Sequence, residues 1–187
     1  GKNAAYDRAR VIGAWQRFGE SRHDRRTGRT IKGNQIERVD AYSLNVDLDK
    51  QINSRLSLFY GLEGVFNHIR STAYDLNIHS KVRTPAQTRY PHNSTWQTYG
   101  GYANLKYRIT PKLILTTGAR YTHYAISARF DTTFIPLPFT SAVNSNGALN
   151  GAAGVSFLPN PTMRMYVNLA TGFRAPNVSV ALARFHL

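Results

Sequence analysis

The sequence predicts an all-β fold, an antiparallel sheet that forms part of a transmembrane β-barrel. Apolar and polar side chains alternate along several long segments, and a period of two puts them on opposite faces of a strand. These segments exceed the roughly five or six residues usual in soluble strands and match the roughly 9–11 residues of a tilted membrane-spanning strand. Short and long connections also alternate between them, as they do in outer-membrane barrels.

About seven strands are expected from this alternation. They are residues 7–18, 37–48, 55–69, 95–108, 112–128, 149–158 and 163–172. The first places Trp15 on its apolar column, opposite Arg8 and Arg10. The apolar columns of the other six are, in order, Tyr42, Leu44, Val46 and Leu48; Leu56, Leu58, Tyr60, Leu62 and Phe66; Tyr99, Ala103, Leu105 and Tyr107; Leu113, Leu115, Ala119 and Tyr121; Ala153, Val155 and Phe157; and Met163, Met165, Val167 and Leu169.

The connections predict how the strands run. Short turns are expected at 49–54, 110–111 and 159–161, and long polar loops at 19–35, 71–94 and 130–147. Long loops belong to the extracellular end of an outer-membrane barrel, so the odd-numbered strands should run outward. An odd number of strands does not close a bacterial single-chain barrel, and an open edge in hydrocarbon leaves backbone groups unpaired. We therefore expect a part of a larger barrel.

The amino-acid composition and the absence of certain motifs argue against several classes of function. The net charge is +14, but the basic residues gather in expected loops or stand singly on strands, without a basic helix or an RNA-binding aromatic motif. There is no Cys, no paired-His metal motif, no nucleophile elbow and no phosphate-binding loop. We expect no enzyme, no metal site, no cofactor and no nucleic-acid partner. The alternative is a soluble basic β-sandwich that binds nucleic acid or acidic glycans; a passive porin or a surface adhesin is a further one.

Two parts of the expected barrel carry candidate functional residues. Arg or Lys at mid-membrane on the lipid side costs about 2–4 kcal/mol, so the polar columns should face the lumen, where Glu63 would pair with Arg120 or Lys106, or the charges would contact a plug. The expected lumen-facing residues are Arg8, Arg10, Gln16, Asp47, Glu63, Asn104, Lys106, Arg120, Arg164 and Asn168. Loop 71–94 supplies the candidates for ligand binding, His79, Arg83, Arg89, Tyr90 and His92. Imidazole binds iron and Arg binds carboxylates; an ordinary solvated loop is the alternative.

Four stretches of the sequence resemble motifs of a known protein family. They are Trp15-Gln16 followed by Glu20-Ser21-Arg22 and Arg25-Arg26; Tyr60-Gly61-Leu62-Glu63; LTTGARY at 115–121; and NLATGFRAP at 168–176, which contains Gly172, Phe173, Arg174, Ala175 and Pro176. With these stretches in this order, the chain resembles the barrel domain of TonB-dependent outer-membrane receptors. The acidic residues that commonly follow the last motif in that family are missing, because 179–187 reads SVALARFHL.

The resemblance implies a fold, a function and partners. Residues 1–187 would be a partial domain of a twenty-two-stranded barrel in the bacterial outer membrane, with the plug domain and the energy-coupling box outside this chain. The whole receptor would take up a scarce nutrient, in the first place an iron chelate such as a siderophore or haem. Its partners would be the plug, TonB, that iron-chelate ligand, and the lipid and lipopolysaccharide of the outer membrane.

Overall fold

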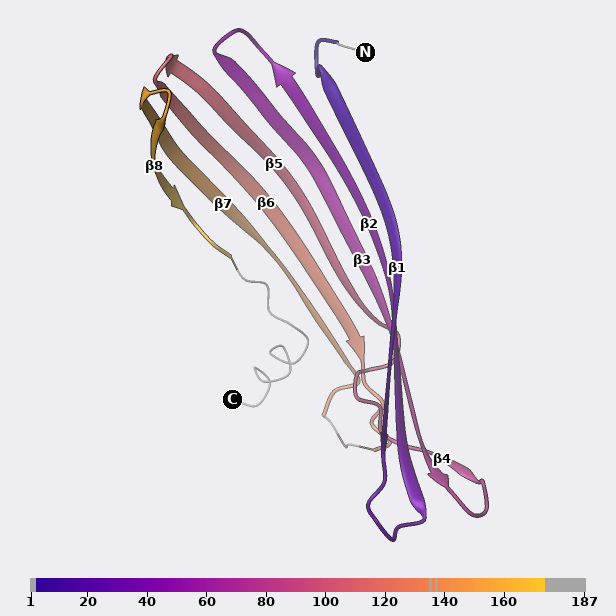
Figure 1. The fold of residues 1–187 in the computed structure, drawn as a ribbon. Helices are drawn as coiled ribbons and strands as arrows, with labels where there is room; N and C mark the ends of the chain where they lie inside the picture. The colour runs from indigo at the N-terminus through magenta and orange to yellow at the C-terminus, as the bar shows by residue number, and fades with distance from the viewer. Residues whose placement is uncertain (1–2, 135, 137, 174–187) are drawn as a thin grey trace.

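The computed structural model describes residues 3–134, 136 and 138–173, and these form one antiparallel sheet. The strands are β1 (Arg8–Asp24), β2 (Ile31–Gln51), β3 (Leu56–Asn77), β4 (Arg83–Pro85), β5 (Ser94–Thr110), β6 (Leu113–Arg129), β7 (Ser141–Asn160) and β8 (Met163–Ala170). The strand order is β1-β2-β3-β5-β6-β7-β8, and the short β4 pairs with β3 beyond the end of β5. Figure 1 shows a single curved and twisted layer with short turns at one end and β4 at the other. Among the described residues, no helix has the length and apolarity to span a membrane.

Most strands are longer than the sequence pattern predicts, whereas β8 ends at Ala170 rather than at residue 172. β2 has 21 residues and β3 has 22, and most of the expected loop 19–35 is strand, which leaves 25–30 as the connection. β7 likewise begins at Ser141 rather than at 149, and β4 was not predicted. The extensions lie at the end of the long connections, where they carry polar residues on both faces. Alternation marks a strand only where one face is apolar, so the pattern found the part of each strand that has an apolar face and missed the rest.

The register gives the sheet a polar and an apolar face. Residues directly opposite one another in an antiparallel pair project from the same face. One row runs Arg10, Asp47, Gly61, Tyr102 and Arg120 across five strands. By the same register, all ten residues expected to face the lumen lie on this polar face.

The apolar face has the height of a membrane band. On β2 its column runs from Tyr42 to Leu48 and is bounded by Asp40 and Lys50. The ten residue steps from Asp40 to Lys50 span about 33 Å of extended chain. At a tilt of about 45° this is a rise of about 23 Å, close to the apolar band of about 25 Å in outer-membrane barrels.

This apolar face is uncovered in the part of the chain that the structure describes. Leu149 is 73% exposed and Leu169 is 76% exposed. Among the described residues, only Tyr124, Ile126 and Ala128 are buried apolar side chains. A sandwich needs a second sheet over the apolar face, so the alternative of a soluble β-sandwich is wrong.

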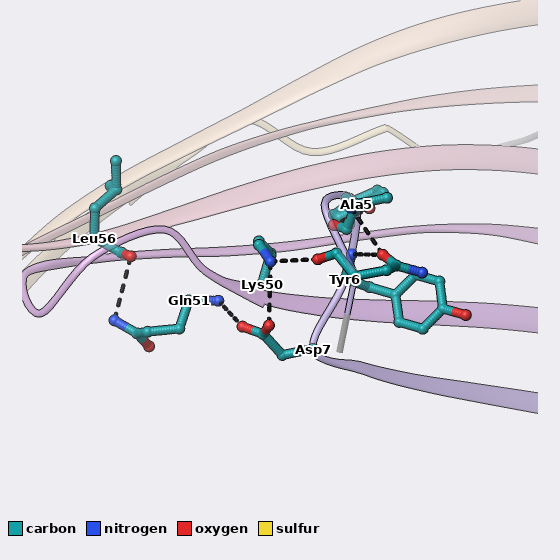
Figure 2. A network of polar contacts seen from close by, with 8 residues as sticks. Ala5, Tyr6, Asp7, Lys50, Gln51 and Leu56 are labelled. Atoms are coloured by element: carbon teal, nitrogen blue, oxygen red, sulfur yellow. Dashed lines mark hydrogen bonds and ion pairs between the residues drawn. The ribbon is translucent and has the colours of Figure 1, made fainter. Parts of the chain in front are cut away.

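The short-turn end is tied together by polar contacts around the segment that leads into β1 (Figure 2). The ammonium group of Lys50 donates to the carbonyl of Asn3 at 2.6 Å and to the carboxylate of Asp7 at 3.1 Å. The backbone N–H of Gln51 donates to the other oxygen of Asp7 at 2.8 Å, and the Gln51 side chain reaches the carbonyl of Leu56 at 3.2 Å. These contacts fix the start of β1 against the turn between β2 and β3.

Candidate ligand-binding site

Side chains on the polar face lie flat along the sheet and link strands that are not neighbours. Arg10 on β1 donates to Asp47 on β2 at 2.8 Å, and the hydroxyl of Tyr102 on β5 donates to the same carboxylate at 2.6 Å. Tyr102 reaches across β3 at Gly61, where a Cβ atom would lie 2.7 Å from its hydroxyl oxygen. The missing side chain of Gly61 therefore makes room for the contact.

A second link joins Arg120 on β6 to Glu63 on β3 across Gly100 on β5. The Nε of Arg120 also donates to Thr122 at 3.0 Å, which fixes the guanidinium. Of the two partners expected for Glu63, the structure selects Arg120. Lys106 shares the face without an ion pair in the described part of the chain, and Arg164 makes a long contact of 3.4 Å to Ser156.

The connection from β4 to β5 crosses the polar face at the end opposite the short turns. The backbone N–H of Ala86 donates to the carbonyl of Ala73, and the side chain of Gln35 donates to the carbonyl of Gln87 at 3.5 Å. Arg89 reaches Glu20 on β1 at 3.3 Å. Segment 86–93 therefore lies over β3, β2 and β1, on the same face as the polar links.

Glu37 lies beneath this segment. It is 4% exposed, and neither of its carboxylate oxygens has a hydrogen-bond partner among the described residues. It stands directly opposite Glu20 on β1 and Ser71 on β3, while Arg22 pairs with Glu20 at 2.8 Å. A buried carboxylate without a partner is costly, so the covered face under segment 86–93 is a polar site rather than a packed core.

The structure divides the five predicted ligand-binding residues into two groups. Arg89, Tyr90 and His92 belong to segment 86–93, where the ring of His92 donates from Nδ1 to the carbonyl of Ser71 at 2.8 Å. His79 lies in the turn between β3 and β4, and Arg83 on β4 stacks on the ring of Tyr74 at 4.8 Å. The six residue steps of β3 from Ser71 to Asn77 span about 20 Å, so the two groups do not form one site.

A pocket that the sequence analysis missed opens beside segment 86–93. Its volume is about 360 Å³, and its lining includes Asp24, Arg25, Arg26, Arg29, Gln35 and Asp75. Three arginines from the connection between β1 and β2 thus meet the polar face near Gln87. The signal was the basic run at 22–32, which the sequence alone describes only as a charged loop.

The connection between β6 and β7 also lies at this end of the sheet, and Phe173 after β8 contacts β6 nearer the middle of the sheet. The hydroxyl and backbone N–H of Thr133 hydrogen-bond Asp131, which lowers the pKa of that carboxyl and keeps it ionised. Phe173 stacks on Tyr124 with ring centroids 6.0 Å apart. Of the predicted family motif, Gly172 and Phe173 are described, whereas Arg174, Ala175 and Pro176 lie outside the described residues.

A single sheet with an exposed apolar face of bilayer height and a linked polar face is the wall of an outer-membrane β-barrel. The sequence profile of the family described as "TonB dependent receptor-like, beta-barrel" matches residues 2–185. The chain belongs to this family of receptors, which are not enzymes and lie in the bacterial outer membrane.

Solved structures agree with this assignment. The chain is similar to the copper transporter OprC at 13% identity and a TM-score of 0.71, over 94% of this chain and 29% of that one. It is also similar to the ferric yersiniabactin uptake receptor FyuA from Yersinia pestis at 15% identity and a TM-score of 0.62, over 86% and 24%. The unliganded ferric citrate transporter FecA gives 15% identity, a TM-score of 0.60 and the same coverage.

The chain thus spans less than a third of the length of each of these three proteins, and at these identities the likeness concerns the fold. No curated protein matched the chain in a sequence comparison.

Proposed function

We propose that this chain is part of the barrel wall of a TonB-dependent transporter that takes up an anionic metal chelate, in the first place an iron chelate such as a siderophore or haem. In the complete receptor the polar face lines the lumen and contacts a plug domain. TonB supplies the energy from the inner membrane. The end with the long connections faces the outside of the cell.

The arginine pocket at this end supports the proposal most directly. Arg25, Arg26 and Arg29 outnumber the two aspartates of the lining. Guanidinium groups bind carboxylates in a planar, two-pronged geometry, which suits citrate, haem propionates or a carboxylate siderophore. Arg89, Tyr90 and His92 lie on the adjoining segment and can contact a ligand that enters the pocket.

The polar links support the assignment of the lumen. A plug must be held by a hydrated wall and must also be able to move. Arg10, Asp47 and Tyr102 engage one another along the wall, as do Glu63 and Arg120, so they present a polar surface without leaving large unpaired charges toward the plug.

Ligand binding to the full-length receptor tests the proposal. Purified receptor in detergent is titrated with ferric citrate, a ferric tris-catecholate, haem and copper(II) ions, and binding is followed by quenching of Trp fluorescence. We expect an iron chelate to bind and the variant Arg25→Ala/Arg26→Ala/Arg29→Ala to bind it at least about tenfold more weakly, since each charged hydrogen bond contributes about 1.5–3 kcal/mol.

A matched control removes three cations at the other end of the sheet. Arg55→Ala/Arg108→Ala/Lys112→Ala should leave binding unchanged, because these residues lie beside the short turns. Binding of copper(II) alone, or equal affinity in the pocket variant and the wild type, would contradict an anionic chelate as the ligand.

A further inference from the structure

Charged residues stand on the apolar face, where the sequence pattern did not place them. Arg17 on β1, Asp40 on β2 and His68 on β3 form one row across this face. The next row toward the long connections contains Arg38 opposite Arg70. On the other side of the Asp40 row, toward the short turns, the neighbouring row contains Trp15, Tyr42 and Phe66. The cations thus begin where the aromatic residues end, and aromatic residues mark the interface of a barrel with the membrane.

Asp40 forms ion pairs with two of these three arginines, Arg17 and Arg70. It is 2% exposed and accepts from the Nε of Arg17 at 2.6 Å and from Arg70 at 2.7 Å. Arg17 also lies over the ring of Trp15 at 5.2 Å. One carboxylate holds two guanidinium groups that remain about half exposed, so most of their N–H donors stay free for another ligand.

Arg38 has neither an ion pair nor a hydrogen bond from its side chain to any other described residue. It faces Arg70 directly across the β2–β3 pair, and like charges in this position repel one another. Three arginines against one aspartate leave a cluster with a net charge of about +2. A multivalent anion that binds between Arg38 and Arg70 would remove the repulsion.

An apolar groove continues from this cluster into the membrane band. Its volume is about 440 Å³, and Tyr42, Leu44, Leu62, Phe66 and Tyr99 line it around Gly64. Tyr42 and Phe66 belong to the aromatic row that lies next to Asp40 on the side of the short turns. The groove therefore begins one row from the cations and runs along the face that the fold leaves uncovered.

We propose that this surface binds a phosphate-bearing lipid of the outer leaflet, with the phosphate on Arg17, Arg38 and Arg70 and an acyl chain in the groove at Gly64. The positive charge of the cluster favours a phosphate group, since guanidinium groups bind phosphate in a two-pronged geometry. The position of the cluster favours a lipid, since cations at the height of the headgroups adjoin a groove at the height of the acyl chains. The inference depends on the proposed orientation of the apolar face toward lipid.

Native mass spectrometry of the full-length receptor in detergent, with added bisphosphorylated lipid A, tests the inference. Arg38→Gln is the main variant, because it leaves both partners of Asp40 in place. We expect it to weaken lipid A binding about tenfold. Lipid A stripped of its phosphates should bind the wild type weakly and show no response to Arg38→Gln. Gly64→Leu, which fills the groove, should also weaken binding of bisphosphorylated lipid A.

Two control variants make the outcome specific. Arg55→Gln removes an exposed cation at the short-turn end, and Gly151→Leu adds a side chain to the apolar face on β7, away from the groove; both should bind lipid A as the wild type does. Equal binding by Arg38→Gln and the wild type, equal binding of the dephosphorylated lipid, or an equal loss in Arg55→Gln would overturn the inference. Chelate binding in the same samples reports on the proposed function separately, because the arginine pocket opens on the other face.

Discussion

Glu63 has two candidate cations on its face of the sheet, and the structure pairs it with Arg120 rather than with Lys106. The sequence placed all three residues on one face but could not choose between them. The choice depends on register, because Glu63 lies opposite Gly100 whereas Lys106 lies opposite Ser57, about 20 Å farther along the strands. Gly100 then leaves an open path for the guanidinium of Arg120.

The Glu63–Arg120 pair should contribute measurably to stability. About a third of each side chain is exposed, so we expect a coupling free energy of about 1 kcal/mol after solvent screening. A double-mutant cycle of Glu63→Gln and Arg120→Gln, measured by urea unfolding of the full-length receptor in bilayers, gives this value. In the matching cycle with Lys106→Gln the coupling should be near zero; a larger coupling to Lys106 than to Arg120 would contradict the pairing.

Gly61 should be intolerant of a larger side chain. In Gly61→Val the new Cβ would clash with the backbone carbonyl of Val46 and would displace the hydroxyl of Tyr102 from Asp47, and we expect a loss of about 1–3 kcal/mol in the free energy of unfolding. Gly13→Val is the control, because a Cβ at Gly13 meets no atom within 4 Å. Similar losses in the two variants, measured in the same unfolding assay, would mean that Gly61 is not needed for the link.

At the scale of the element, β2 combines two environments along its length. Its apolar column from Tyr42 to Leu48 lies within the band of bilayer height, and the residues from Ile31 to Asp40 extend past it. Periodicity predicted the strand from residue 37 to residue 48 and missed residues 31–36. Outside the band both faces of the strand meet polar surroundings, so the strand is maintained by pairing with β1 and β3 rather than by an amphipathic pattern.

The two faces of β2 should respond differently to the same substitution. Leu44→Arg places a cation in the middle of the apolar column and should cost about 2–4 kcal/mol. Asn45→Arg, one residue along the strand, places it on the polar face and should cost little. Folding yields into lipid bilayers measure both; equal yields would contradict the assignment of the apolar face to lipid.

At the scale of the whole molecule, the described sheet has two edges, β1 and β8, and each pairs on one side only. Unpaired backbone groups in hydrocarbon cost several kcal/mol each, so we expect further strands of the complete barrel to pair with both edges. The coverage of less than a third of the related chains agrees with this expectation. That the complete barrel has twenty-two strands stays a prediction.

The 187-residue chain by itself should require detergent. Its apolar side chains are exposed along one entire face, including Leu62 at 66% and Val167 at 70%, and large apolar surfaces drive association in water. Size-exclusion chromatography with and without detergent measures this behaviour. A monodisperse monomer in plain buffer would be evidence against a membrane-facing surface.

The sequence by itself determined the all-β class, the facing of each strand within the band, the short turns and the family. These are properties of local alternation, which depends only on the two-residue period of a strand. Tertiary structure decided the rest: the strand extensions past the band, the partner of Glu63, the arginine pocket, and the cations of the apolar face around Asp40. Each of these depends on the register between strands or on a connection folding over the sheet, and residues distant along the chain become neighbours only when the sheet has formed.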